Sequence, residues 1–207
     1  VLISLILFAN SIYSQDSYYY FSRGQNLMDS NDFRRAKLYF DSALIKNPNH
    51  TNSYFNRGLC LGMLDDTIGS LNDFVKYLEL VPNDPDAYER IGYLKKELKD
   101  TSGAIRSFDS CLKYDPSNYD ARISRGKMHW MIDSLLKSHN DFEYAYHLDT
   151  NKIEGVYFKG VSHYMLEQYD SAIKYLSLSF KKDTNYINAL YYKAYSNYEK
   201  NGNIYFK

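Results

Sequence analysis

The stretch PDAYERIGYLKKELKDTSGAIRSFDSCLKYDPSN, residues 85–118, decides the fold of this chain. Its landmarks are Gly92, Ala104, Phe108 and Pro116, and each of them has counterparts at intervals of 34 residues or multiples of it. The series are Gly24, Gly58, Gly92, Gly126 and Gly160; Pro48, Pro82 and Pro116; Phe40, Phe74, Phe108 and Phe142; Ala36, Ala104 and Ala172. A fixed period of this length indicates an array of stacked helical repeats.

Counting repeat one from Ser17 puts glycine at position 8, alanine at 20, an aromatic residue at 24 and proline at 32. This pattern resembles the tetratricopeptide repeat family, a helix–turn–helix unit of 34 residues. The resemblance covers 17–207 and implies an all-α fold, a right-handed superhelical solenoid of antiparallel helix pairs. We expect five full repeats and one partial repeat, at about 17–50, 51–84, 85–118, 119–152, 153–186 and 187–207.

Helix starts can be placed by capping residues. Position 16 should be the N-cap of each second helix, because short acceptor side chains there satisfy free backbone N–H groups. In the first four repeats it holds Asp32, Asp66, Asp100 and Ser134. Asp84 followed by Pro85 predicts the start of a first helix, since proline suits the first helical position.

Arginine at position 7 and aspartate at position 23 occur together in two repeats, although repeat one has Arg23 with Tyr39. Repeats two and four carry Arg57 with Asp73 and Arg125 with Asp141, whereas repeat three has Ile91 and Ser107 and repeat five has Lys159 and Tyr175. We therefore predict an ion pair between the two helices of repeats two and four. An exposed pair of this kind contributes about 0–1 kcal/mol.

The N-terminal residues 1–14 read as a secretory signal peptide, with an apolar run followed by small residues. We expect an exported protein, periplasmic or secreted, without a membrane span once this leader is removed. The alternative is a short hydrophobic helix that packs on repeat one.

Composition argues against several function classes. Lys+Arg and Asp+Glu both number 25, without the basic stripe of a nucleic-acid-binding protein. Phosphate loops, HExxH runs and CxxC pairs do not occur, so we expect no enzyme, no cofactor and no metal site. Cys60 and Cys111 are expected to be buried and not to form a disulfide. His129 and His163 share position 11, where a packing role is expected.

The resemblance implies a concave groove lined by the first helices of successive repeats. The candidate binding residues are Phe55, Asn56, Arg90, Tyr93, Lys127, Trp130, Tyr157, Tyr164, Tyr191 and Tyr195. Tyr and Trp offer large contact area and a polar tip. Because the chain has 23 Tyr, such rings can also be packing residues, and both interpretations stay open for Trp130, Tyr164 and Tyr195.

These features predict a non-catalytic scaffold that binds a protein or peptide partner. Asn56 and Arg90 occupy two positions of the family's clamp for C-terminal carboxylates, but Asp86 in another would repel a carboxylate, so this specificity is not predicted. The alternatives are a carbohydrate or small-ligand module, because aromatic faces stack on sugars, and a sensor or adaptor fragment of a longer exported protein.

Overall fold

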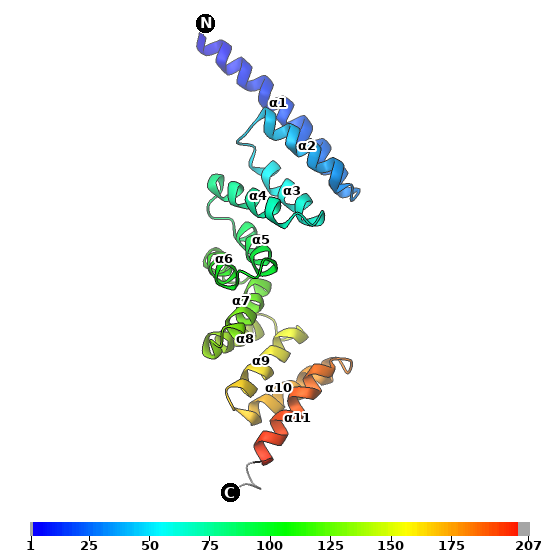
Figure 1. Cartoon of the computed structure of the whole chain (residues 1–207), viewed down its shortest axis with the longest axis vertical. Helices are drawn as coiled ribbons and strands as arrows, with labels where there is room; N and C mark the ends of the chain where they lie inside the picture. Colours follow the sequence, from blue (N-terminus) through cyan, green and yellow to red (C-terminus); the bar gives the residue numbers. More distant parts are fainter. Residues whose placement is uncertain (1, 203–207) are drawn as a thin grey trace. The chain divides into compact units, whose positions relative to one another are not determined.

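The computed structural model describes the backbone of residues 2–202 and the side chains of residues 16–202. The secondary structure of the described part is helical, and the chain divides into two bodies, Val1–Tyr114 and Asp115–Lys207. Figure 1 shows the helices in chain order. They are α1 Leu2–Asp29, α2 Phe33–Lys46, α3 Thr51–Met63, α4 Thr67–Leu80, α5 Pro85–Glu97, α6 Thr101–Tyr114, α7 Tyr119–Met131, α8 Leu135–Leu148, α9 Ile153–Met165, α10 Tyr169–Lys182 and α11 Ile187–Gly202.

The N-terminal body consists of three helix pairs, α1 with α2, α3 with α4, and α5 with α6. Within each pair, the glycine at position 8 leaves room for the phenylalanine ring at position 24. A Cβ atom on Gly24 would lie 2.6 Å from the Phe40 ring, and one on Gly58 would lie 3.1 Å from the Phe74 ring. These rings are almost fully buried, so the smallest residue sets the helix spacing.

The C-terminal body repeats this arrangement in the pairs α7 with α8 and α9 with α10, and α11 packs on α10 and α9. Phe142 lies against Gly126, and Leu176 takes the place of the aromatic ring against Gly160. The prediction of an all-α fold of paired helices, five pairs and one further helix in the described residues, is confirmed.

Side-chain hydrogen bonds to the helix start form at three of the four predicted N-cap positions. The carboxylates of Asp32, Asp66 and Asp100 accept hydrogen bonds from backbone N–H groups three residues later, at 2.9–3.1 Å. Ser134 is the N-cap residue of α8, as predicted, but its hydroxyl makes no cap hydrogen bond. Asp84 caps α5 and Pro85 begins it, as predicted.

The predicted ion pairs form, and they are more buried than an exposed pair. Arg57 donates from Nε and Nη2 to the two carboxylate oxygens of Asp73, at 2.7 and 2.6 Å. Arg125 makes the same two-point contact with Asp141. Asp73 and Asp141 are only 5% and 3% exposed, so each pair contains a carboxylate that is almost completely desolvated.

The predicted leader, 1–14, overlaps α1, whose side chains are described only from Asp16 onward. The signal peptide therefore lies outside the residues described with side chains and stays a prediction. Within the described residues, no helix has both the length and the hydropathy that crossing a bilayer requires. Cys60 and Cys111 are buried and form no disulfide, as predicted.

Candidate functional site

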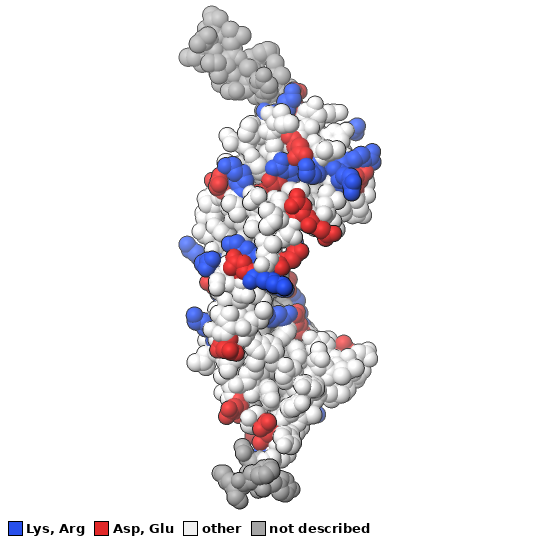
Figure 2. Space-filling view, viewed as in Figure 1, with Lys and Arg blue, Asp and Glu red and all other residues white. Residues whose placement is uncertain are grey.

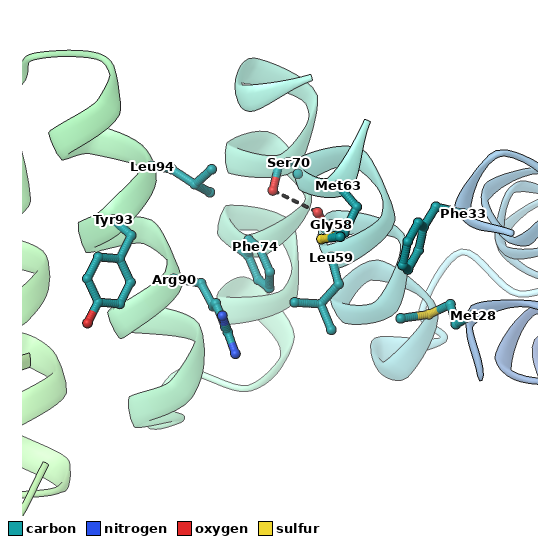
Figure 3. Close-up of a pocket in the computed structure, with 11 residues that line it drawn as sticks. Met28, Phe33, Gly58, Leu59, Met63, Ser70, Phe74, Arg90, Tyr93 and Leu94 are labelled. Atoms are coloured by element: carbon teal, nitrogen blue, oxygen red, sulfur yellow. Dashed lines mark hydrogen bonds between the residues drawn. The ribbon is translucent and has the colours of Figure 1, made fainter. Parts of the chain in front are cut away.

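A hollow of about 350 Å³ opens on the N-terminal body and is lined by residues of α1, α2, α3, α4 and α5. Figure 3 shows its lining, in which α3 and α5 face each other across the opening. We call it the groove hollow. Its lining residues are Met28, Phe33, Gly58, Leu59, Gly62, Met63, Ser70, Phe74, Arg90, Tyr93 and Leu94.

The groove hollow is apolar inside and charged at one edge. Met28, Leu59 and Met63 supply flexible aliphatic and thioether surface, which adapts to ligands of differing shape. The Ser70 hydroxyl donates to the Gly58 carbonyl oxygen at 2.7 Å, so this buried polar group is satisfied within the protein (Figure 3). Arg90 is exposed and has no ion-pair or hydrogen-bond partner among the described residues, which leaves its guanidinium available to a ligand.

A second, polar hollow of about 250 Å³ is lined by Phe21, Gln25, Asn52, Phe55, Asn56, Tyr77 and Asp84. The amides of Gln25, Asn52 and Asn56 have no hydrogen-bond partner among the residues that the structure describes. Asn56 and Leu59 are three residues apart on α3, so the polar and apolar hollows share one helix face. Such amides can pair with the backbone of an extended peptide.

Tyr77 closes the polar hollow. Its hydroxyl donates to the Asp84 carboxylate at 2.6 Å. Burial first, and then the neighbouring Asp84, raise the pKa of Tyr77 to about 12. Tyr77 is therefore a neutral donor at physiological pH, and Asp84 is held both by this hydrogen bond and by its capping role on α5.

The structure brings four predicted binding residues to these two hollows. Arg90 and Tyr93 line the groove hollow, whereas Phe55 and Asn56 line the polar hollow. The Phe55 ring packs edge-on against Phe74, with centroids 5.2 Å apart, and is only partly exposed. Phe55 thus helps to build the floor, while the Arg90 and Asn56 side chains offer polar groups to a partner.

Three predicted residues of the C-terminal body are engaged in packing. Tyr157 is 6% exposed and belongs to a buried cluster, so we leave it out of the binding surface. Trp130 and Tyr164 are partly buried against the same cluster. Their rings therefore contribute to the core of this body.

The other three predicted residues of this body lie nearer the solvent. Lys127 forms an ion pair with Glu154 at 2.6 Å, which occupies its charge within the protein. Tyr191 and Tyr195 are 56% and 42% exposed, and their ring centroids lie 4.6 Å apart on α11. Among the six predicted residues of the C-terminal body, these two tyrosines present the largest aromatic surface to solvent.

Sequence reasoning missed several lining residues of the groove hollow, among them Met28 and Met63. Met28 shares repeat position 12 with the predicted residues Trp130 and Tyr164, and Met63 stands at position 13, so their spacing could have identified them. The emphasis on rings as partner contacts excluded them, although thioether side chains serve adaptable binding surfaces equally well.

On the face shown in Figure 2, positive and negative side chains are interspersed over the N-terminal body. In the described part of the chain, no group of three His, Cys, Asp or Glu residues is placed to hold a metal ion. His129 is buried, and the His163 ring stacks on the Tyr175 ring with centroids 5.5 Å apart. Both histidines therefore pack against other parts of the protein.

Two family models, both described as tetratricopeptide repeat, match residues 21–88 and 85–118. A comparison with curated proteins finds no match in sequence. YrrB, described as a TPR protein with an unusual peptide-binding site, is similar in structure, with a TM-score of 0.76 and 18% identity over 84% of this chain and 90% of that one.

Two further solved structures are similar to this chain. MamA from Desulfovibrio magneticus RS-1 has a TM-score of 0.75 and 18% identity, covering 83% of this chain and 97% of that one. A tetratricopeptide repeat protein from Parabacteroides merdae has a TM-score of 0.78 and 15% identity, covering 92% and 75%. At these identities the likeness is one of fold.

Proposed function

Because this chain belongs to the tetratricopeptide repeat family, we propose that it is a non-catalytic scaffold whose N-terminal body binds a peptide segment of a partner protein. The fold supports a protein–protein interaction scaffold in general. YrrB, which shares this fold, is described as having a peptide-binding site, so a peptide is the natural ligand to test first.

The observation that carries this proposal is the groove hollow with Arg90 at its edge. An apolar side chain of the peptide would enter between Leu59, Met63 and Tyr93, where burial of apolar surface provides the driving force. Arg90 would pair with an acidic group on the same peptide, and the amides of the polar hollow would bind its backbone. Little ordering is needed, because stacked helices hold these groups in place before binding.

We further propose that the protein is exported, on the strength of the apolar N-terminal run. Mass spectrometry of the protein recovered outside the cytoplasm tests this proposal. A mature N-terminus between Ile12 and Gln15 is expected, and an intact apolar leader on the exported protein would contradict it.

The binding proposal is tested with peptides selected from a random library on the wild-type chain. Met63→Glu with Arg90→Glu places two negative charges in the groove hollow and should weaken the selected peptides at least about tenfold, which is roughly 1.4 kcal/mol. Ile45→Glu is the matched control, because Ile45 is 79% exposed and lines neither hollow. Unchanged binding by the double variant would contradict the proposal. Failure to select any peptide, together with binding to a glycan array, would favour a carbohydrate module.

A further inference from the structure

Charged side chains fill the gap between the second helices of consecutive repeats. In repeat two, Arg57 on α3 reaches Asp73 on α4 and donates from Nη1 to Asp41 on α2 at 2.7 Å. In repeat five, Lys159 on α9 pairs with Glu143 on α8 at 2.7 Å. These contacts involve positions 7 and 23 of one repeat and position 25 of the preceding repeat. The cation at position 7 pairs with acidic side chains at the other two positions where these are present.

Repeat three has no charge at these three positions, which are Val75, Ile91 and Ser107. In place of the ion pairs there is a hollow of about 250 Å³ between α4 and α6, with α5 beneath it. We call it the back hollow. It is lined by Val75, Leu78, Tyr88, Ile91, Lys95, Arg106, Ser107 and Ser110.

The back hollow is distinct from the groove hollow, although α5 contributes to both. Ile91 and Lys95 lie four residues apart on one stripe of α5, whereas Arg90 and Leu94 lie on another stripe. No residue lines both hollows. A ligand in the back hollow therefore leaves the groove hollow open.

The lining of the back hollow combines apolar surface with two cations. Val75 is 45% exposed although it is aliphatic, and Ile91 forms a buried base. Lys95 and Arg106 flank this surface, and neither has an acidic partner within the described residues. The lining includes no carboxylate, so its charge is positive throughout.

Three hydroxyl groups complete the lining. Tyr88 donates to the Pro82 carbonyl oxygen at 3.0 Å, Ser107 to that of Gly103 at 2.9 Å, and Ser110 to that of Arg106 at 3.1 Å. Because each hydroxyl proton is already used within the protein, the oxygens remain as acceptors. They can accept hydrogen bonds from the N–H groups of a ligand.

We propose that the back hollow is a second binding site, which takes a segment of a partner protein in which an acidic residue adjoins an aliphatic one. The carboxylate pairs with Lys95 and Arg106, in charge-assisted hydrogen bonds that are the stronger kind. The aliphatic side chain covers Val75 and Ile91, and backbone N–H groups of the segment donate to the serine oxygens. A peptide uses all three features, whereas a simple fatty carboxylate leaves the acceptors without donors.

The test uses the full chain labelled with ¹⁵N and the probe acetyl-Glu-Leu-Glu-Leu-amide, followed by NMR up to about 5 mM peptide, a range suited to weak binding. Chemical-shift changes centred on Val75, Ile91 and Ser107 are expected. Changes centred on Leu59 and Tyr93 instead, or none at all, would overturn the proposal. Equal binding of acetyl-Lys-Leu-Lys-Leu-amide would also overturn it, because the acidic group would then not be needed. Equal binding of hexanoate would overturn it because the peptide backbone would then not be needed.

Two double variants localise the binding. Lys95→Gln with Arg106→Gln removes both cations without changing the buried Ile91, and should lower the affinity for the acidic probe at least about tenfold. Arg23→Gln with Arg34→Gln removes the same charge from exposed positions of the same body outside the back hollow, and should leave the affinity unchanged. Equal losses in the two variants would mean a general charge effect and would overturn the proposed site.

A third variant fills the hollow. Ile91→Arg with Ser107→Asp copies the pair of Arg57 and Asp73 into repeat three, so the new side chains occupy the space of the ligand. Loss of the probe's shift changes, with an unchanged far-UV circular dichroism spectrum, is the expected result. This outcome is separable from the groove test, because peptides selected for the groove hollow should bind this variant as they bind the wild type.

Discussion

The ring of Phe108 lies directly against the Cα atom of Gly92, so that a Cβ atom on Gly92 would lie 2.5 Å from ring carbon Cε1. Phe108 is fully buried, so its ring is enclosed by the fold. This contact joins α5 to α6 and shows why a glycine recurs where two helices of one repeat cross.

Gly92→Ala should therefore lower the free energy of unfolding by about 1–3 kcal/mol, the usual cost of overpacking a core. Urea unfolding followed by circular dichroism measures the change. Gly62→Ala is the matched control, since its nearest contact is an ordinary one of 3.5 Å to Ser70 Oγ. In α3 that alanine should be neutral or stabilising by up to about 1 kcal/mol, and equal losses at both sites would contradict this packing argument.

The ion pair of Arg57 with Asp73 should matter more to the free energy of unfolding than an exposed ion pair, because Asp73 is buried. Arg57→Ile leaves that carboxylate without its cation and should cost about 3 kcal/mol or more. Arg57→Ile with Asp73→Ser copies the neutral residues of repeat three and should recover most of this loss. A double-mutant cycle measures the coupling, and additive losses would contradict a buried pair.

The period of the repeats and the local capping residues made much of the fold predictable. Gly92 and Phe108 are 16 residues apart, a spacing that recurs, and Asp32 caps a helix through contacts within its own turn. The volume left between side chains is not encoded locally. Ile91 and Ser107 were recognisable as the missing ion pair, but the back hollow depends on how α4, α5 and α6 pack.

Repeat position alone also did not separate packed rings from exposed ones. Tyr157 and Tyr191 share position 5 of their repeats, yet their exposures are 6% and 56%. Tyr186 and Tyr192 cover the Tyr157 ring, with centroids 4.9 and 6.2 Å away. Burial at this position is therefore decided by the rings that pack over it, at the end of the same repeat and in the next one, which the position within a repeat does not specify.

Lys99 is strained by the turn between α5 and α6, where its φ is 60°. This left-handed conformation disfavours a side chain with a Cβ atom and suits glycine. Lys99→Gly should raise the free energy of unfolding by up to about 1 kcal/mol. Urea unfolding measures it, and Lys96→Gly within α5 is the control that should be destabilising. A loss of stability at Lys99 would contradict the strain argument.

Acid should destabilise the C-terminal body through His139. Burial first, and then the nearby His163 and Lys159, lower the pKa of His139 below its ordinary 6.5, with Glu143 opposing them. Because the unfolded state then binds the proton more readily, the stability from neutral His139 is complete above about pH 6.5 and is lost as pH falls from there through the folded pKa.

Urea midpoints at about pH 7.5 and pH 5.5, which bracket the ordinary histidine pKa, measure this effect. His139→Gln should reduce the difference between the two midpoints. Burial likewise lowers the pKa of His50 in the N-terminal body, so His50→Gln should reduce the difference independently. If both variants lose stability on acidification as steeply as the wild type, the neutral histidines are not its cause.

Truncating aromatic side chains should separate packing rings from exposed ones in the C-terminal body. Trp130 lies partly buried against the cluster around Tyr157 and Leu176, so Trp130→Ala should cost about 2–3 kcal/mol, somewhat less than a fully buried ring. Tyr191 is 56% exposed, and Tyr191→Ala should change the free energy of unfolding by no more than about 0.5 kcal/mol. Circular dichroism is the suitable probe, because Trp130 is the only tryptophan of the chain and its removal abolishes the tryptophan fluorescence. Equal and small effects at both positions would contradict a packing role for Trp130.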